Sequence, residues 1–291
     1  MALKVFRMDA SGCNGCDIEI LSATLDPRLG EDVVQIVHDP SEAQALLVTG
    51  GVNVKSLEEL KSAVAKLREP KLVVAIGTCA SSMCVFKGSY PMKGPLDAVT
   101  PVSVAILGCP PRPLTLVNAL RSALDGSWKV PESDAAGPEG MRGKISHDSA
   151  KCTACGACVR SCPSGAIDLA FEGEKARIAF NLWKCSFCGT CQDVCPDDAV
   201  RLTSAAPGWN SSKVDAAVTG GMVRAKCVSC GVPTHAERQI AAIRARADEK
   251  GEVKGEGRSH LDESLSLCPS CKSGITRVAS SRKRMGSWIY D

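Results

Sequence analysis

The 291-residue chain has few aromatic side chains, which make up 4% of its residues, and it contains no long apolar run. No window approaches the roughly eighteen uncharged apolar residues of a membrane-spanning helix, so we expect the polypeptide not to cross a bilayer. The N-terminus resembles neither a secretory signal peptide nor a twin-arginine signal. These absences predict a cytoplasmic location, and any attachment to a membrane would have to be made through other subunits.

A strong charge of one sign is also missing. The 35 lysines and arginines nearly balance the 32 aspartates and glutamates, and the formal net charge is +3. With few aromatics and no broad basic stretch, the composition argues against a nucleic-acid partner. The largest basic run, residues 282–284, is typical of a solvated tail.

Cysteine is abundant, with 17 residues, and eight of them form the motif C-x-x-C-x-x-C-x-x-x-C-P twice. Bacterial ferredoxins hold two 4Fe-4S clusters with this spacing, and the fourth cysteine of each run ligates the other cluster. We therefore assign one cluster to Cys152, Cys155, Cys158 and Cys195, and the other to Cys185, Cys188, Cys191 and Cys162. Zinc is the alternative, but zinc sites seldom use such runs. Disulfides are disfavoured in a reducing cytosol.

Residues 1–125 alternate strand-like and helix-like segments. Short valine-rich runs at 33–37, 45–49, 71–76 and 103–107 are typical of buried parallel strands. Apolar residues at helical spacing within 57–67 and 114–124 predict helices between and after them. This alternation predicts an α/β domain with a flavodoxin-like, doubly wound parallel sheet.

The rest of the chain divides by composition. Residues 126–144 are rich in Pro, Gly, Ser and mixed charge and predict a linker. We expect an α+β ferredoxin domain with two 4Fe-4S clusters at 145–204, a second linker at 205–222, and a small zinc-ribbon-like module with a tail at 223–291. Within that module, Thr234 and Glu237 have the spacing of a capping box that opens a helix, which Gly251 ends.

Four further cysteines lie in the α/β domain, at positions 13, 16, 79 and 109. Cys79 and Cys109 each follow a predicted strand, which places both thiols in the crevice at the carboxyl ends of a parallel sheet. The pair Cys13 and Cys16 completes four thiolates for a third 4Fe-4S cluster. Buried structural thiols are the alternative, because free cysteine packs as a small apolar residue. We assign no metal to Cys84.

The last four cysteines form two C-x-x-C knuckles, Cys227 with Cys230 and Cys268 with Cys271. Paired knuckles predict a structural tetrahedral zinc site. A rubredoxin-like iron or two unpaired knuckles are the alternatives. The residues beside these knuckles differ from those that flank the cysteine pairs of NiFe centres, so we expect no such centre in this chain. We expect His235 and His260 to be exposed rather than metal ligands.

Three motifs of the α/β domain carry a family resemblance. They are C-N-G-C-D-I-E-I from Cys13, G-T-C-A from Gly77 and G-C-P-P-R-P from Gly108. Together they resemble the small subunit of energy-converting membrane-bound NiFe hydrogenases, and the related cluster-carrying subunit of respiratory complex I. The complex I subunit has adjacent cysteines at the first motif, so the C-x-x-C form favours the hydrogenase branch. Residues 145–271 resemble the ferredoxin-type subunit of formate hydrogenlyase complexes, so the chain resembles a fusion of two neighbouring subunits.

The resemblance implies that Cys13, Cys16, Cys79 and Cys109 hold a proximal cluster that faces a NiFe centre in a separate large subunit. Further implied partners are the membrane subunits of a complex I-like assembly and an electron-donor enzyme or ferredoxin. The chain is then an oxidoreductase subunit that relays electrons and has no catalytic residue of its own. The alternative is a complex I-like, ferredoxin-oxidising subunit that passes electrons to quinone or a sulfur compound. A zinc-stabilised scaffold that only binds partners is the alternative outside redox chemistry.

Two details of the resemblance bear on local structure. In the wider hydrogenase family an acidic residue near the second cysteine is linked with proton traffic, and Glu19 has that place here. Without the resemblance, a glutamate in the first turn of a helix is a surface residue that interacts with the helix dipole. The family is expected to have glycine where this chain has Met83 and Cys84, so we expect the loop there to differ.

Overall fold

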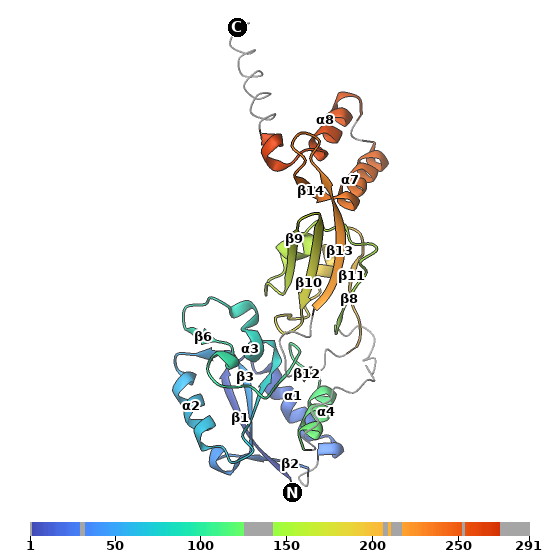
Figure 1. Cartoon of the computed structure of the whole chain (residues 1–291). Helices are drawn as coiled ribbons and strands as arrows, with labels where there is room; N and C mark the ends of the chain where they lie inside the picture. Colours follow the sequence, from blue (N-terminus) through green and yellow to red (C-terminus); the bar gives the residue numbers. More distant parts are fainter. Residues whose placement is uncertain are drawn as a thin grey trace, which may run out of the picture.

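The computed structural model describes residues 2–29, 33–124, 142–205, 209–210, 217–251 and 254–273. Three units follow one another: the N-terminal α/β domain, a ferredoxin-like unit and a C-terminal module (Figure 1). Most of the linker predicted at 126–144 and the tail after residue 273 lie outside the described residues. Within the described ranges, every helix is too short or too polar to cross a membrane.

The N-terminal domain is built on a six-stranded sheet with the order β12-β7-β5-β3-β1-β2. Its parallel strands are β1 (Leu3–Ser11), β2 (Val34–Val37), β3 (Ala45–Gly50), β5 (Leu72–Ile76) and β7 (Val104–Ile106). Counted along the chain, these strands have the order 2-1-3-4-5, which is that of flavodoxin-like folds. The antiparallel strand β12 (Trp209–Asn210) pairs with the outer side of β7. Every strand predicted from the sequence is present, and β1 was not predicted.

Helices cover both faces of this sheet (Figure 1). Along β3, Leu46 packs with α2 (Ser56–Lys66) and α3 (Gly77–Ser82) on one face. Its neighbour Leu47 packs with α1 (Gly15–Thr24) and α4 (Pro113–Leu124) on the other. Because successive side chains of a strand point to opposite faces, an unbroken apolar strand contributes to both layers of the core.

Short elements connect the main ones. β4 (Val52–Asn53) and β6 (Met92–Gly94) form an antiparallel pair, and the 3-10 helices are η1 (Pro27–Leu29), η2 (Pro40–Glu42), η3 (Cys84–Phe86) and η4 (Leu96–Ala98).

The ferredoxin-like unit repeats one pattern twice. The first half is β8 (Ile145–His147), α5 (Ala157–Ser161) and β9 (Ile167–Glu172), and the second half is β10 (Lys175–Asn181), α6 (Thr190–Asp193) and β11 (Val200–Leu202). β8 pairs with β11 and β9 with β10, so the halves exchange strands. Ala154 and Phe187, at the same place in the two cysteine runs, have φ values of 56° and 55°. The backbone thus repeats as the sequence does.

Residues 217–223 of strand β13 (Ala217–Lys226) pair with the whole length of β10, and the sheet is thereby extended to the order β14-β13-β10-β9. Part of the segment predicted as a linker at 205–222 is therefore strand. Its glycines and small residues predict a loop, but the free edge of β10 supplies the hydrogen bonds that make it a strand.

The C-terminal module contains β14 (Pro233–Ala236), α7 (Glu237–Lys250) and α8 (Glu256–Leu265). The predicted capping box is wrong: Ala236 is the N-cap of α7 without a side-chain cap. Thr234 lies in β14, where its hydroxyl donates to the Ala225 carbonyl at 3.1 Å. The predicted end of the helix is confirmed, because Gly251 follows α7 with a φ of 61°. The threonine that the sequence pattern assigned to a helix cap therefore bonds from β14 to the neighbouring strand β13 instead.

The two-layer core predicts a sharp contrast between two leucines. Leu46→Ala removes a fully buried side chain of β3 and should lower the free energy of unfolding by about 2–5 kcal/mol. Leu25→Ala, the same substitution at an exposed position after α1, should change it by less than about 0.5 kcal/mol. Urea unfolding of the anaerobic chain, followed by circular dichroism, measures both. Equal losses would contradict this account of the core.

Candidate iron-sulfur and metal sites

The fold brings four N-terminal cysteines to one edge of the sheet. Cys13 follows β1, Cys16 lies in the first turn of α1, Cys79 lies in α3 directly after β5, and Cys109 follows β7. Because these strands are parallel, their carboxyl ends meet at the same edge. Cys13 and Cys109 are exposed, while the other two thiols are half-buried. The sheet therefore collects the predicted ligands from three separate segments.

These thiols influence one another electrostatically. Burial raises the pKa of Cys16, and the charges of Cys79, Cys109 and Cys13 raise it further. Burial also raises the pKa of Cys79 to about 12, with contributions from Cys84, Cys109 and Cys13. Because several buried thiolates cannot coexist without a compensating cation, this donor set fits a metal group that binds thiolates.

Gly77 leaves room for one of these sulfurs. A Cβ atom at this position would lie 2.5 Å from Cys16 Sγ, and the residue has a φ of +83°. Both the space and the backbone conformation therefore require glycine. Thr78, the next residue, donates its backbone N–H to the Gly108 carbonyl at 2.9 Å and so ties the Cys79 loop to the Cys109 loop.

Each crossed set of four ferredoxin-type cysteines lines its own cavity. One cavity has Cys152, Cys155, Cys158 and Cys195 in its wall. A second cavity has Cys162, Cys185, Cys188 and Cys191 in its wall. We call them the Cys152 cavity and the Cys185 cavity. The grouping is that expected from the spacing, in which the fourth cysteine of each run joins the other run.

Backbone N–H groups point at the sulfurs in a repeated way. The N–H of Ala166 donates to Cys162 Sγ at 3.3 Å, and that of Ala199 donates to Cys195 Sγ at 3.2 Å. Cys185 Sγ accepts from the N–H of Phe187 at 3.3 Å. Such donors favour the charged thiolate and tune the reduction potential of an iron-sulfur cluster.

The Cys185 cavity adjoins the N-terminal domain. The hydroxyl of Thr78 lies 2.8 Å from the Cys185 carbonyl oxygen and 3.0 Å from the Gly108 carbonyl oxygen. Arg142 donates to the Cys188 carbonyl, and Arg112 donates to the Ser204 carbonyl at 2.6 Å. The Thr78 bond places the residue next to Cys79 against the second cysteine run, and the Arg112 bond joins the segment after Cys109 to the segment after β11.

A cleft lies at this junction, with Cys109 and Cys188 in its wall. Glu19 also lines it, and burial raises the pKa of this carboxyl group above its usual range. Glu19 is therefore not the fully solvated helix residue that its position alone predicts.

Cys84 lies between the two groups of thiols. It is buried, and burial raises its pKa, while the Val85 backbone N–H and the Ser186 hydroxyl act in the opposite direction. Met83 and Cys84 have φ values of 69° and 47°. Two positions where glycine is expected therefore have the backbone conformation that favours glycine, although both carry side chains.

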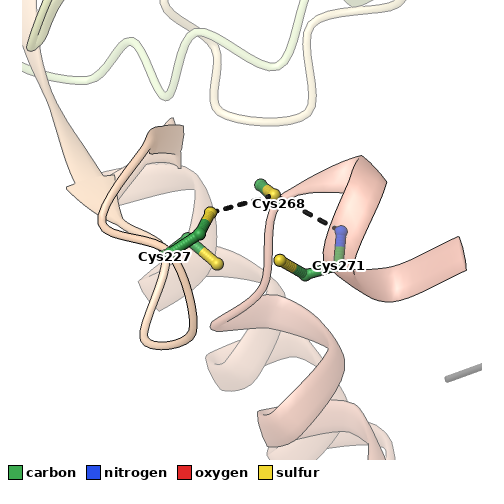
Figure 2. A group of neighbouring side chains, drawn as sticks. Cys227, Cys268 and Cys271 are labelled. Carbon is green, nitrogen blue, oxygen red and sulfur yellow. Dashed lines mark hydrogen bonds between the residues drawn. The ribbon is translucent and has the colours of Figure 1, made fainter. Parts of the chain in front are cut away.

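The C-terminal cysteines form a much tighter group. The four sulfurs of Cys227, Cys230, Cys268 and Cys271 all lie within 4.8 Å of one another, and Cys230 Sγ is 3.6 Å from Cys268 Sγ. Figure 2 shows the labelled thiols facing one another from two separate segments. A tetrahedral ion with metal–sulfur bonds of about 2.3 Å would hold sulfurs about 3.8 Å apart. The geometry therefore fits one ion rather than a cluster.

The two histidines considered as alternative ligands lie outside this four-cysteine group. His260 is exposed, as expected, and its Nδ1 lies 4.0 Å from a Glu263 oxygen. His235 is half-buried rather than exposed, and burial lowers its pKa.

Several residues at these sites had no recognisable sequence pattern. Thr78 and Arg142 form hydrogen bonds to carbonyl groups of the second cysteine run, and Asp197 lines the Cys152 cavity. Thr78 stands inside a cysteine motif and Asp197 directly follows a C-P pair, but their partners are 107 and 44 residues away. Only the folded chain identifies those partners.

Comparison with known proteins agrees with this division of sites. Residues 13–123 match the family described as NADH ubiquinone oxidoreductase, 20 Kd subunit, and residues 144–196 match the 4Fe-4S dicluster domain. A probable membrane-bound hydrogenase subunit, mbhJ of Pyrococcus furiosus, is 40% identical over 138 residues, which cover 47% of this chain and 82% of that protein.

Two bacterial relatives match the same domain. Formate hydrogenlyase subunit 7 of Escherichia coli is 36% identical over 122 residues, covering 41% of this chain and 48% of the relative. An NADH-quinone oxidoreductase subunit of Myxococcus xanthus is 37% identical over 139 residues, which cover 46% of this chain and 73% of that subunit. With its three cysteine-bearing segments at one edge of a parallel sheet and these matches, the chain belongs to the family of the 20 kDa subunit of NADH ubiquinone oxidoreductase, extended by a 4Fe-4S dicluster domain.

Proposed function

We propose that this chain is the iron-sulfur electron-transfer subunit of a NiFe hydrogenase complex that attaches to the cytoplasmic face of the cell membrane through partner subunits. The observation that carries the proposal is the contact between two cysteine sites, in which Thr78, beside Cys79, bonds to the carbonyl of Cys185. The relatives in membrane-bound hydrogenase and formate hydrogenlyase support the same class of complex.

Three cysteine sets would each hold a 4Fe-4S cluster. The sets are Cys13, Cys16, Cys79 and Cys109; Cys162, Cys185, Cys188 and Cys191; and Cys152, Cys155, Cys158 and Cys195. A bound cluster of this kind accepts one electron and passes it on. The chain's own residues supply the thiolates, the backbone N–H groups that stabilise their charge, and the fixed spacing between sites.

The contacts between domains favour one order of sites. The Cys185 cavity lies against the N-terminal domain, because the Cys185 carbonyl in its wall accepts a hydrogen bond from Thr78. The Cys152 cavity lies on the side of the C-terminal module, whose α7 bonds to Ser149 and Pro196. Electrons would therefore move between the Cys152 cavity and the N-terminal cysteines through the Cys185 cavity. Joining these sites in one chain keeps them at a high effective concentration.

Helix α1 offers a surface for the large subunit that would carry the NiFe site. Its outer side exposes Ile18 by 64% and Leu21 by 54%, and Leu25 just beyond it by 84%. Cys13, in the segment just before α1, is also exposed. Neighbouring exposed apolar side chains are typical of protein interfaces. A partner bound here would contact α1, the helix that carries Cys16.

The C-terminal knuckles would hold a structural zinc ion. Cys227, Cys230, Cys268 and Cys271 supply a closed set of four sulfurs, which leaves no open position for chemistry. The ion would join the end of β13 to the end of α8 and stabilise a module that has few buried apolar residues of its own.

A complex I-like role is the second candidate. The relative in Myxococcus xanthus, part of an NADH-quinone oxidoreductase, is matched over 73% of its length. In that case the chain would oxidise a ferredoxin and pass electrons to quinone or a sulfur compound. The C-x-x-C form of the first motif favours the hydrogenase role.

Metal analysis tests both the number of clusters and the crossed ligation. Protein made anaerobically should contain about twelve irons and one zinc per chain. Cys195→Ala should lower the iron to about eight, and the double variant Cys155→Ala/Cys195→Ala should also keep about eight, because both residues serve one cluster. Cys84→Ala is the control and should keep about twelve. A fall to about four in the double variant would contradict the crossed assignment, and zinc without iron would remove the electron-transfer function.

The N-terminal site can be removed by one methyl group. Gly77→Ala places a Cβ where Cys16 Sγ lies and forces alanine to a φ of +83°, so iron should fall by about one third. Gly88→Ala is a matched control, because its φ is also +83° but nothing lies within 4 Å of the added atom. Iron content and low-temperature electron paramagnetic resonance measure both variants. Equal iron loss in the two variants would show that strain, rather than the blocked sulfur, is responsible.

The α1 surface predicts a separable defect in assembly. Leu21→Glu should reduce copurification with the large subunit by at least about tenfold, because a charge would be buried in the interface. It should leave the iron content unchanged. Lys61→Glu, on the exposed side of α2, is the distant charge control and should copurify as the wild type does. Copurification of Leu21→Glu at the wild-type level would exclude α1 from the interface.

Activity of the assembled complex distinguishes the two candidate roles. Hydrogen evolution from reduced viologen is expected for the hydrogenase role. Reduction of quinone or of a sulfur compound without hydrogen evolution would favour the complex I-like role instead.

A further inference from the structure

The C-terminal module contacts the ferredoxin-like unit at both sides of the Cys152 cavity. From α7, Arg238 Nη1 donates to the carbonyl oxygens of Ser149 at 2.7 Å and Ala150 at 2.9 Å, just before Cys152. Further along the helix, Arg246 Nη2 donates to the Pro196 carbonyl at 3.3 Å, just after Cys195. Helix α7 thus bridges the two segments that bring the first and last cysteines of this set together.

Arg246 also forms an ion pair with Asp197. The Asp197 carboxylate belongs to the wall of the Cys152 cavity, and its other oxygen accepts from the Thr153 hydroxyl at 2.6 Å. Its side chain is only 16% exposed. The carboxylate is therefore held beside the thiols by two donors, one of which comes from the C-terminal module.

Within the part of the chain that the structure describes, the Cys185 cavity has no such acidic group in its wall. Among the described residues that line it, the polar side chains besides cysteine are Ser164, Ser186 and Thr190, and none is acidic. The two halves of the ferredoxin-like repeat therefore differ in charge at the same kind of site. Asp197 and its partner on α7 account for that difference.

Helix α7 is itself held in place. Arg244 Nε lies 2.7 Å from Asp262 Oδ1 on α8, and Arg258 of α8 lies 2.7 Å from Asp248 Oδ1 and 3.2 Å from Asp262 Oδ2. Helix α8 leads directly to Cys268 of the four-sulfur group. The guanidinium of Arg246 is thus presented by a small module with its own cross-links.

We propose that Arg246 is a positioning residue that raises the reduction potential at the Cys152 cavity by pairing with Asp197. Reduction adds negative charge to the site, and an unpaired carboxylate in the cavity wall opposes that addition. A guanidinium on the carboxylate offsets this repulsion, and the partly buried position limits screening by solvent. The inference rests on the proposed function, because it requires a 4Fe-4S cluster held by Cys152, Cys155, Cys158 and Cys195.

The test is a potentiometric titration of the anaerobic full chain, followed by electron paramagnetic resonance. The midpoint that disappears in Cys155→Ala identifies the site. Arg246→Gln should move that midpoint to a more negative potential and leave the other midpoints unchanged. Asp197→Asn should move it to a more positive potential. The double variant should show a smaller negative shift than Arg246→Gln alone, because the unpaired carboxylate is then gone.

Two further variants separate charge from general disturbance. Arg246→Lys keeps the positive charge and should retain most of the wild-type midpoint. Arg201→Ala removes an arginine whose Nη2 lies 3.9 Å from Asp198 Oδ2, where both side chains are well exposed, and should cause no shift. An unchanged midpoint in Arg246→Gln, or an equal shift in Arg201→Ala or Arg246→Lys, would overturn the inference. Wild-type protein without iron or without the expected signals would instead refute the proposed function.

Discussion

The mutual repulsion of grouped thiolates is the constraint on which the rest of this structure depends. Sets of cysteines meet at the edge of a sheet, in two cavities and between two knuckles, and burial together with neighbouring charges raises the pKa of thiols such as Cys79 and Cys158 to about 12. Ionised thiolates are stable in such places only beside a compensating cation. The metal groups that we propose are therefore part of what makes these arrangements of the chain favourable.

The N-terminal domain and the ferredoxin-like unit are joined beside two of these sets of thiols. The Thr78 hydroxyl reaches the Cys185 carbonyl from α3, the helix that also carries Cys79, so a bond between domains forms beside two sets of thiols. Arg142 and Arg112 add bonds from guanidinium groups to backbone carbonyls at the same junction. A fixed junction holds two sites at one separation, which is a requirement for repeated electron transfer between them.

The C-terminal module contacts a cysteine site to which it contributes no ligand. Its four cysteines lie close together after β13 and after α8, and α7 of the same module places Arg238 and Arg246 against the segments around Cys152 and Cys195. These contacts involve residues beyond the family match at 13–123 and the dicluster match at 144–196. The module therefore gives one half of the ferredoxin-like repeat surroundings that the other half does not have.

The candidate ligands, the repeated cysteine runs and most of the parallel sheet could be predicted from the sequence, because these features depend on short spacings and local apolar patterns. The pattern did not reveal β1, whose buried Leu3, Val5, Met8 and Ala10 are interrupted by charged residues, and it assigned Thr234 to a cap that does not form. The folded chain was needed to show that β13 joins the ferredoxin sheet, that Thr78 meets Cys185, and that Arg246 meets Asp197. The physical reason is that a hydrogen bond or ion pair between distant segments leaves no periodic trace in either segment, since its partners are chosen by how the domains pack.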